Sequence, residues 1–229
     1  MRERPLDLPP LLLLQAWLSP SFPIGAFAYS HAIEAAAEAG DIGDETALAG
    51  WIDDLLRVGS GRNDAVLAAA AHRAALAFDS RAAGEINDLA FALCPSAERR
   101  LETGALGAAF VAIVRAAWPC VGLDLLPEKG EIAYPIAFGL ACGGRQIDLE
   151  ACLAAYLLAF ASNLISAALR CAPIGQTQAQ RVLANLGPVI VECARFAAGS
   201  EIDDVGGAAL RSDIASMRHE TQYSRMFRS

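Results

Sequence analysis

Few side chains in this sequence combine the residue types and spacing that catalysis or metal binding requires. Its histidines number three, His31, His72 and His219. His31 and Glu34 are three positions apart, so a helix could turn both toward one ligand, such as a metal ion. Two ligands do not make a site, because protein metal centres take three or four. The pair therefore predicts a solvated or interface polar face, and we expect no bound metal.

The nucleophiles and glycines of the chain also lack catalytic neighbours. No serine or cysteine stands with a histidine and a carboxylate in an arrangement that activates a nucleophile. Gly104 and Gly107 lie inside a helical pattern, and no Gly-x-x-x-x-Gly-Lys-Ser/Thr loop is present to hold a nucleotide phosphate. We expect no catalytic residue and no cofactor, and the chain is predicted not to be an enzyme.

The composition favours protein partners. Apolar residues make up 55% of the chain, against roughly 45–50% in ordinary soluble domains. The formal net charge of −8 opposes nucleic acid and anionic lipid as partners, because both are bound through a surplus of lysine and arginine. We therefore expect apolar surface buried between subunits, a homodimer of twofold symmetry, and contacts with basic patches of other proteins.

One stretch has the length and composition of a membrane span. Residues 151–169 contain no charged side chain, which reaches the lower limit for a spanning helix. Polar residues interrupt it, and its larger side chains recur on one helical stripe, at Leu149, Leu153, Tyr156, Leu157, Phe160 and Leu164. A single stripe is typical of a buried helix, so we predict a core helix rather than a membrane span.

Two further features bear on the compartment. The start of the chain is basic at residues 1–4 and apolar at 11–14, like a secretory signal, but Asp7, Pro9 and Pro10 interrupt the part that a signal keeps apolar. The six cysteines form no Cys-x-x-Cys pair; they are Cys94, Cys120, Cys142, Cys152, Cys171 and Cys193. We predict free buried thiols and a cytoplasmic protein without a targeting segment.

The predicted fold is all-α. Strand signals are scarce, and alanine and leucine, which favour helices, dominate. We expect a single-domain bundle of roughly eight to ten helices packed around a long helix at 149–170. The expected helices cover 11–18, 26–39, 44–58, 64–78, a shorter segment up to 93, 96–118, 132–142, 149–171, 177–198 and 212–219.

Helix-capping and helix-breaking residues add detail to the predicted fold. Asp44 and Ser96 are expected N-terminal caps, and Pro188 should kink the helix that contains it. Residues 119–130 are rich in helix breakers and are expected to form a mobile loop. The helical domain is predicted to span 1–211, and 212–229 to form a short helix and a flexible C-terminal tail that binds a partner.

The two ends of the chain carry the strongest interaction signals. Residues 22–30 place aromatic side chains around a Pro-Ile-Gly turn, which suits either the core or a socket for a partner or for the chain's own tail. Residues 218–229 are basic and aromatic, and such side chains anchor interfaces. The candidate partner-binding residues are Phe22, Pro23, Gly25, Phe27, Tyr29, Ser30, Glu34, His219, Glu220, Tyr223, Arg225, Phe227, Arg228 and Ser229.

We expect residues 218–229 to be mobile or loosely docked in the free protein and ordered on binding. Tyr223 and Phe227 are four positions apart and would share one apolar face if the segment became helical. Arg225 and Arg228 would supply directed hydrogen bonds. Truncation after Gln222 is therefore predicted to remove partner binding while leaving stability almost unchanged.

Four segments, in this order, resemble the UreF family of urease accessory proteins. Residues 22–34 resemble its Leu-Pro-Val-Gly-Ala-Phe-Ser-Tyr-Ser-x-Gly-Leu-Glu signature, and 225–229 resemble its Arg-Leu-Phe-x-Ser ending. Residues 134–135 and 170–176 are similar to its Tyr-Pro and Arg-x-x-Pro-Leu-Gly-Gln segments. The resemblance covers residues 10–229. Among the departures, Ala32 replaces a glycine, which we interpret as a place where another backbone can approach closely.

The resemblance implies a cytoplasmic accessory protein, without a reaction of its own, that assists nickel delivery to apo-urease. Proteins like it form a complex with the accessory protein UreD, also called UreH, and recruit the GTPase UreG, which carries the nickel. They are commonly dimeric. The implied partners are therefore UreD (UreH), UreG and apo-urease, with no nucleic acid and no membrane.

Two other functions stay open. The protein could accelerate GTP hydrolysis by UreG through an arginine finger, for which Arg99, Arg181 and Arg225 are nominal candidates. Independently of the family, it could be a helical membrane or small-ligand-binding protein if residues 151–169 span a bilayer. Measuring GTP turnover with and without the protein distinguishes the first from a scaffold, and cell fractionation tests the second.

Overall fold

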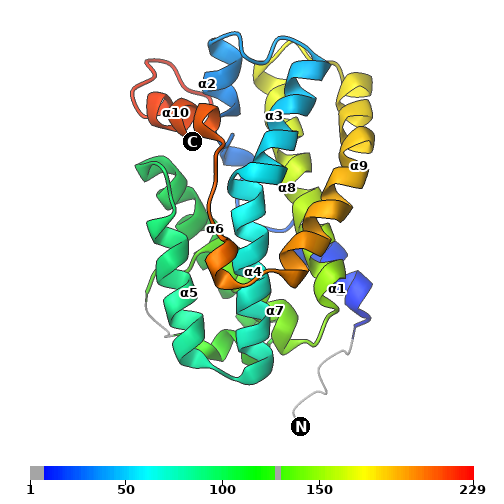
Figure 1. The fold of residues 1–229 in the computed structure, drawn as a ribbon, viewed down its shortest axis with the longest axis vertical. Coiled ribbons are helices and arrows are strands. Elements are labelled where there is room, and N and C mark those ends of the chain that lie inside the picture. Colours follow the sequence, from blue (N-terminus) through cyan, green and yellow to red (C-terminus); the bar gives the residue numbers. More distant parts are fainter. Residues whose placement is uncertain (1–7, 127–129) are drawn as a thin grey trace.

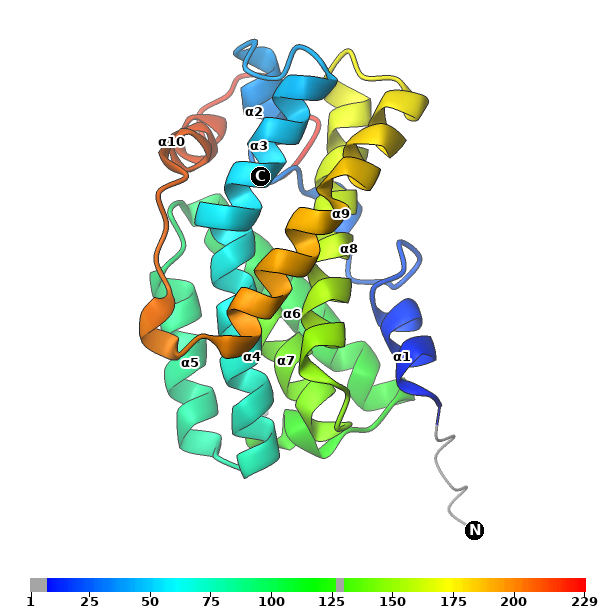
Figure 2. The same cartoon turned by 45° about the vertical axis from the view of Figure 1, so that its right-hand side comes forward.

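The computed structural model describes residues 8–126 and 130–229. Within these residues the regular structure is helical and no strand occurs, so the prediction of an all-α fold is confirmed. The basic start at residues 1–4, Asp7 and the breaker Pro127 lie outside the described residues. Figures 1 and 2 show an elongated bundle whose last residue lies near one end, close to α2 and α10.

The helices follow one another in chain order. They are α1 (Pro10–Trp17), η1 (Ala26–Ala28), α2 (Ile33–Glu38), α3 (Glu45–Val58), α4 (Ser60–Ala77), α5 (Ser80–Ala92), α6 (Ala97–Ala117), η2 (Val121–Leu125), α7 (Tyr134–Gly144), α8 (Leu149–Cys171), α9 (Gln176–Gly199), η3 (Ile202–Asp204) and α10 (Leu210–His219). The elements marked η are short 3-10 helices.

The centre of the bundle is formed by α4 and α7, and the prediction that α8 is the central helix is wrong. Every residue of α7 from 135 to 143 is buried. A Cβ atom at Gly139 would lie 2.3 Å from the carbonyl oxygen of Ala68, and one at Gly143 would lie 2.4 Å from that of His72. The absence of side chains at these two glycines lets α4 and α7 pack backbone to backbone. The long apolar stretch of α8 favoured that helix as the centre, but it carries no information about this close contact.

Helices α8 and α9 are long and apolar enough to cross a membrane by length and composition alone. In the structure the stripe of α8 is directed inward, and Leu153, Tyr156, Leu157 and Leu164 are buried in the core. Helix α8 packs against α9, and α9 packs against α3 (Figure 2). The apolar composition of α8 is therefore explained by core packing, as its single stripe predicted.

The predicted helix starts are confirmed at two caps. The carboxylate of Asp44 accepts from the backbone N–H of Ala47 at 2.8 Å, and the hydroxyl of Ser96 accepts from that of Arg99 at 3.2 Å. Such bonds satisfy amide groups that the first helical turn leaves without partners.

Two predicted elements differ from the structure. Residues 26–39 do not form one helix, because η1 and α2 are separated by a left-handed turn. Residues 121–125, predicted as part of a mobile loop, form η2, whose Leu123 is fully buried and accepts through its carbonyl from Arg115 at 2.8 Å. Helix α9 contains Pro188, in agreement with the predicted helix 177–198, and the kink at Pro188 stays a prediction.

Candidate partner-binding surface

The tail segment, residues 220–229, is folded against one end of the bundle. It follows α10 and makes contacts with η1, α2, α6 and α8 (Figures 1 and 2). Phe227 is only 4% exposed and Ser229 only 2% exposed. The prediction of a mobile or loosely docked tail is wrong for this structure, because the segment finds partners for both its backbone and its side chains.

The end of the tail pairs with the backbone that follows η1. The N–H of Arg228 donates to the carbonyl oxygen of Ala28 at 2.9 Å, and the N–H of Ser30 donates to the carbonyl oxygen of Ser229 at 2.9 Å. The Ser30 hydroxyl donates to that same Ser229 oxygen. These bonds bring together residues 28–30 and 228–229, the two signals that the sequence places at opposite ends of the chain.

One carboxylate on α2, that of Glu34, collects three donors. The backbone N–H of Met226 donates to Glu34 Oε1 at 2.7 Å, that of Phe227 donates to Oε2 at 3.0 Å, and His219 Nε2 lies 3.1 Å from Oε2. Burial by itself raises the pKa of the Glu34 carboxyl, but these hydrogen bonds outweigh burial and hold the pKa below its usual value. The ionised carboxylate is therefore stabilised by the docked tail.

The imidazole of His219 lies between two carboxylates and is completely buried. Its Nε2 faces Glu34, while its Nδ1 lies 2.6 Å from Glu98 Oε2 at the start of α6. The other oxygen of Glu98 accepts from the guanidinium of Arg225 at 2.6 Å. Side chains from α2, α6, α10 and the tail thus form one continuous polar chain.

Phe227 occupies an apolar position that an arginine covers. The guanidinium carbon of Arg170, at the end of α8, lies 3.9 Å from the centre of the Phe227 ring, a cation–π geometry. A guanidinium N–H of Arg170 also donates to the carbonyl oxygen of Phe27 at 2.5 Å. Arg170 therefore clamps the tail from α8 and joins it to η1.

A buried ionic cluster lies beneath the end of the tail. The hydroxyl of Ser229 donates to Glu102 Oε2 at 2.5 Å, and Glu102 is paired with the guanidinium of Arg99 on the preceding turn of α6. His31 Nδ1 lies 3.5 Å from Glu102 Oε1. Burial alone raises the pKa of the Glu102 carboxyl, but Arg99 and His31 hold it well below the usual range.

Two other members of this cluster have shifted pKa values. Burial raises the pKa of Asp64 to about 6, against the opposing influence of Arg99 and of the Tyr156 hydroxyl, which donates to Asp64 at 2.9 Å. Burial and the charge of Arg99 lower the pKa of His31 to about 4, although Glu102 acts in the other direction. His31 is therefore neutral at pH 7, and its Nε2 lies 2.5 Å from the hydroxyl of Ser60.

The turn before α2 has a left-handed backbone at two successive residues without glycine. The φ angle is +56° at His31 and +68° at Ala32. This corrects our interpretation of Ala32, whose resemblance to a glycine position we attributed to close backbone approach. A positive φ is the physical reason, because glycine adopts this conformation without the steric cost that a Cβ atom introduces.

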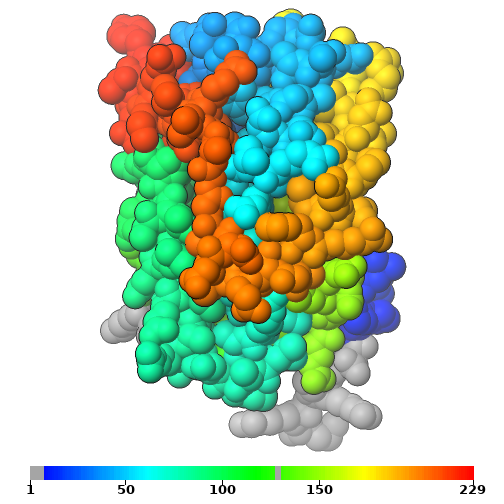
Figure 3. Space-filling model, viewed as in Figure 1, coloured from blue at the N-terminus to red at the C-terminus, as the bar shows by residue number. Residues whose placement is uncertain are grey.

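Helix α10 is oriented with its apolar stripe toward solvent. Leu210, Ile214 and Met217, which are spaced by four and three positions, are 65%, 48% and 50% exposed. The opposite face, directed at α2 and α6, is buried and carries Ser212, Ala215, Ser216 and His219. This is the reverse of the usual arrangement for a surface helix. In Figure 3 the α10 and tail residues, coloured orange to red, cover one corner of the molecule.

The outward side chains of α10 and the tail form what we call the α10–tail surface. Its apolar members are Leu210, Ile214, Met217, Tyr223 and Met226, and its exposed arginines are Arg211, Arg218, Arg225 and Arg228. Tyr223 is fully exposed and Met226 is 61% exposed. An apolar patch with exposed arginines has the composition of a protein interface.

The structure brings together about half of the predicted site residues. Those that meet in the docking contacts are Ser30, Glu34, His219, Arg225, Phe227, Arg228 and Ser229. Phe22 and Tyr29 are core residues, and the Phe22 ring packs 5.6 Å from that of Phe110. Pro23, Phe27 and Tyr223 are exposed, and Gly25, with φ +78°, directly precedes η1. Glu220 is also exposed, but its carboxylate accepts from the backbone N–H of Ala97 at the start of α6 at 2.7 Å.

Tyr223 and Phe227 do not share a face in this structure, because the segment is not helical and the expected common face requires a helix. The helix ends at His219, and the residues after it form turns, so four positions do not equal one helical turn there. Tyr223 points into solvent, whereas Phe227 is buried under Arg170. One aromatic residue anchors the tail to its own chain, and the other stays available on the outside.

Sequence reasoning missed the body residues that receive the tail. Glu98 and Glu102 have no predicted role, although they and Arg99 are nearly or fully buried under the tail. Arg170 belongs to the Arg-x-x-Pro segment but had no predicted role. The close spacing of Glu98, Arg99 and Glu102 on α6 was the available signal. Only the position of the docked tail shows that this face of α6 is buried.

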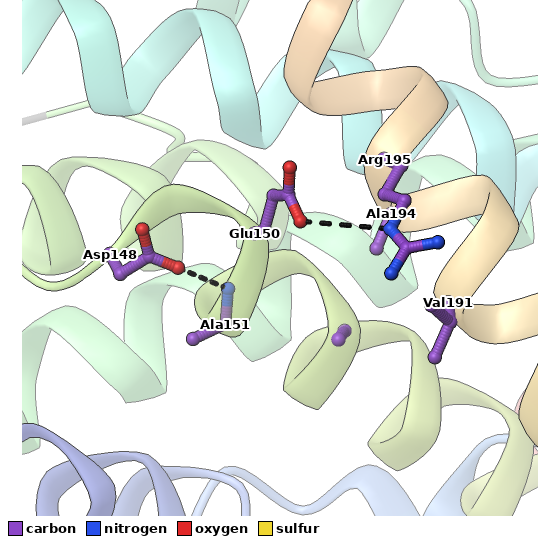
Figure 4. A pocket seen from close by; sticks show the side chains of 7 residues that line it. Asp148, Glu150, Ala151, Val191, Ala194 and Arg195 are labelled. Carbon is purple, nitrogen blue, oxygen red and sulfur yellow. Dashed lines mark hydrogen bonds and ion pairs between the residues drawn. The ribbon is translucent and has the colours of Figure 1, made fainter.

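Outside this region the structure offers little for ligand chemistry. A hollow of about 290 Å³ lies where α8 begins beside α9 (Figure 4). Its carboxylates are already engaged, since Asp148 accepts from the N–H of Ala151 at 2.9 Å and Glu150 lies 3.9 Å from Arg195. Within residues 8–126 and 130–229, no three histidine, cysteine, aspartate or glutamate side chains are placed to hold a metal ion.

The three nominal arginine-finger candidates are all paired. Arg99 is buried beside Glu102, so it does not reach a nucleotide bound outside. Arg181 lies 2.7 Å from Glu45, and Arg225 lies 2.6 Å from Glu98. Arg181 and Arg225 are exposed, and an arginine finger at either position must first break its ion pair.

Comparison with known proteins gives a consistent result. The UreF family model matches residues 42–187. A urease accessory protein UreF from Methylobacterium sp. (strain 4-46) is 52% identical over 220 residues, covering 95% of this chain and 88% of that protein. One from Xanthobacter autotrophicus (strain ATCC BAA-1158 / Py2) is 53% identical over 229 residues, covering 99% of this chain and 93% of that protein. One from Bradyrhizobium sp. (strain ORS 278) is 48% identical over 224 residues, covering 97% of this chain and 93% of that protein.

Proposed function

The chain belongs to the UreF family of urease accessory proteins, and from that premise we propose that it scaffolds a complex of UreD (UreH) and UreG on apo-urease and assists nickel insertion. A role in urease maturation follows from the family itself. Nickel is cargo in this proposal, handled by the assembled complex. The proposed location is the cytoplasm, in keeping with six cysteines that are all free thiols.

The observation that carries the proposal is the reversed orientation of α10. A helix that buries serine and alanine while exposing Leu210, Ile214 and Met217 leaves apolar area in water. Covering that area stabilises a complex, at roughly 25 cal/mol per Å² of apolar surface removed from water before the costs of association. The exposed Tyr223 and Met226 extend the same surface beyond the helix.

The charge of this surface narrows the choice of partner. Arg218 and Arg228 are exposed here on a chain whose net charge is −8. Two copies joined through this surface by a twofold axis would bring like charges together, whereas a partner with an apolar groove and acidic rim would be attracted. We assign this surface to a protein of another kind, and UreD is the proposed one.

The other proposed contacts lie elsewhere on the molecule. Self-association into a homodimer, and the approach of UreG and apo-urease, are assigned to other faces in this proposal. The high apolar content of the chain, 55%, supports several interfaces rather than one. Light scattering at micromolar concentration tests the dimer, which should dissociate on dilution, whereas a monomer at all concentrations contradicts it.

The direct test is co-purification with matched surface variants. Tyr223→Ala and Met226→Ala should each weaken UreD binding by roughly tenfold or more, as loss of an interface anchor does. Phe78→Ala is the control, because Phe78 is 70% exposed and lies at the end of α4, away from the α10–tail surface. Unchanged UreD binding in both tail variants contradicts the proposal for this surface.

The cellular test concerns nickel. In a ureolytic host that lacks this protein, urease should accumulate but contain little nickel, because apo-urease then lacks the complex that loads it. Re-expression of the wild type should restore nickel content, and re-expression of the Tyr223→Ala variant should restore less. Full urease activity at low nickel in the deletion strain contradicts the proposed role.

A further inference from the structure

We infer that Glu34 is a positioning residue, which holds α10 and the tail segment in the orientation that makes their outward side chains one partner-binding surface. The inference rests on the proposed function, because it takes the α10–tail surface as the place where a partner binds. Glu34 itself does not form that surface, since its side chain is only 10% exposed.

The hydrogen bonds of the Glu34 carboxylate fix the positions of two segments, the end of α10 and the tail. Both oxygens of Glu34 are used: Oε1 accepts from Met226 N–H at 2.7 Å, and Oε2 accepts from Phe227 N–H at 3.0 Å and faces His219 Nε2 at 3.1 Å. His219 is the last residue of α10, and Met226 and Phe227 belong to the tail. The helix end and the tail are therefore placed relative to one another through Glu34.

Each docked group has an exposed neighbour. Phe227 is buried while Met226 beside it is 61% exposed, and His219 is buried while Arg218 beside it is exposed. The contacts with Glu34 thus determine which side chains face outward. If they open, Met226 loses its fixed relation to Met217 and Arg218 on α10, although no residue of the surface has changed.

Docking of the tail is cooperative, because a partly docked tail leaves the Glu34 carboxylate buried without all of its donors. A buried ionised group that loses its donors keeps the full cost of desolvation, which favours either all three contacts or none. A partner that binds only the docked state has an apparent Kd equal to its intrinsic Kd divided by the docked fraction. Any factor by which the docked fraction falls should therefore appear as the same factor in affinity.

The experiment compares Glu34→Gln with Glu38→Gln. Both remove one negative charge from α2, but Glu38 is exposed at the end of that helix. Glutamine at position 34 retains the shape of the side chain and directs an NH₂ group at backbone donors. Hydrogen exchange measured by mass spectrometry reports docking of residues 220–229, and titration with purified UreD reports affinity.

We expect Glu34→Gln to speed exchange in the tail by roughly tenfold or more, as loss of a charge-assisted hydrogen bond does. The exchange rates give the docked fraction of the tail, and UreD binding should weaken by the factor by which that fraction falls. Glu38→Gln should change neither quantity. Met226→Ala should weaken binding with little change in exchange, because Met226 contacts the partner while its backbone stays docked. Glu98→Gln loosens His219 from the other side and is the second variant if Glu34→Gln does not fold.

The outcomes separate the two proposals. An unchanged docked fraction in Glu34→Gln overturns the positioning role, and so does a lower docked fraction with unchanged UreD affinity while Met226→Ala still weakens binding. A lower docked fraction with unchanged affinity in Glu34→Gln, together with unchanged affinity in Met226→Ala, overturns the proposed partner surface instead. A fall of docked fraction and affinity by the same factor in Glu34→Gln, with neither change in Glu38→Gln, supports the inference.

Discussion

His219 and Glu34 are separated by 185 positions in the chain, yet His219 Nε2 lies 3.1 Å from Glu34 Oε2. The imidazole is completely buried, and its other nitrogen lies 2.6 Å from Glu98. One ring therefore joins α10 to both α2 and α6. The end of the chain belongs to the same packed structure as the bundle, which changes what is expected when the tail is altered.

Substitution of the two aromatic residues of the tail should change the stability of the protein by very different amounts. Phe227→Ala should lower the free energy of unfolding by about 3 kcal/mol, because it empties a buried position under Arg170. Tyr223→Ala should change the free energy of unfolding by less than about 0.5 kcal/mol, because Tyr223 is fully exposed. Urea denaturation followed by circular dichroism measures both, and equal effects would contradict the docked position of Phe227.

Truncation after Gln222 now has a different expected result from the one the sequence suggests. It removes Phe227 and leaves the carboxylates of Glu34 and Glu102 without tail donors, so the thermal midpoint should fall at least as far as in Phe227→Ala. A truncated protein with the midpoint of the wild type would show that the tail is not docked in solution.

Ala32→Gly should stabilise the protein by roughly 0.5–1 kcal/mol, because glycine relieves the left-handed strain at φ +68° while only one buried methyl is lost. The matched control is Ala36→Gly in the middle of α2, where the same chemical change should cost about 1 kcal/mol or more. Thermal or urea unfolding gives both values. Destabilisation of similar size at both positions would contradict the strained turn.

Gly139→Ala should be strongly destabilising, by about 2 kcal/mol or more, because its Cβ atom would lie 2.3 Å from the Ala68 carbonyl oxygen and push α7 away from α4. Gly50→Ala is the control, since Gly50 is exposed within α3 and a Cβ atom placed there meets no other part of the molecule within 4 Å. It should stabilise by up to about 1 kcal/mol through helix propensity. Equal tolerance at both sites would contradict the close crossing.

Asp64→Asn should stabilise the protein more at pH 7.5 than at pH 4. Burial favours the protonated carboxyl and raises the pKa of Asp64 to about 6 in the folded state, from about 3.8 when exposed. The stability that the protonated form contributes is complete below about pH 3.8 and is lost as the pH rises through 6. The full loss amounts to roughly 3 kcal/mol. Asparagine does not titrate, and its carbonyl can still accept from Tyr156.

The measurement is the difference in unfolding free energy between Asp64→Asn and the wild type, followed from pH 4 to 8. Using the difference is necessary because His31 titrates in the opposite direction: its pKa is lowered to about 4, so its contribution is present above about 6.5 and is lost as the pH falls. A difference that is independent of pH would contradict the buried position of the Asp64 carboxyl.

The sequence by itself determined the fold class and the family of this protein. Helix caps such as Asp44 and Ser96, and the stripe along α8, act within a few positions of one another, so their structural consequences follow from local spacing. The scarcity of histidines and the lack of a phosphate loop are likewise visible in the sequence alone. The ordered motifs at both ends identified residues that do meet in space.

The tertiary structure alone decided how those ends are used. Spacing suggested that Tyr223 and Phe227 act together, but burial separates them, because Phe227 fills a position beneath Arg170. Glu98 and Glu102 are typical of a solvated helix face until the tail covers them and supplies donors. Such contacts join residues more than a hundred positions apart, and whether a polar side chain is solvated or paired depends on what the fold places against it.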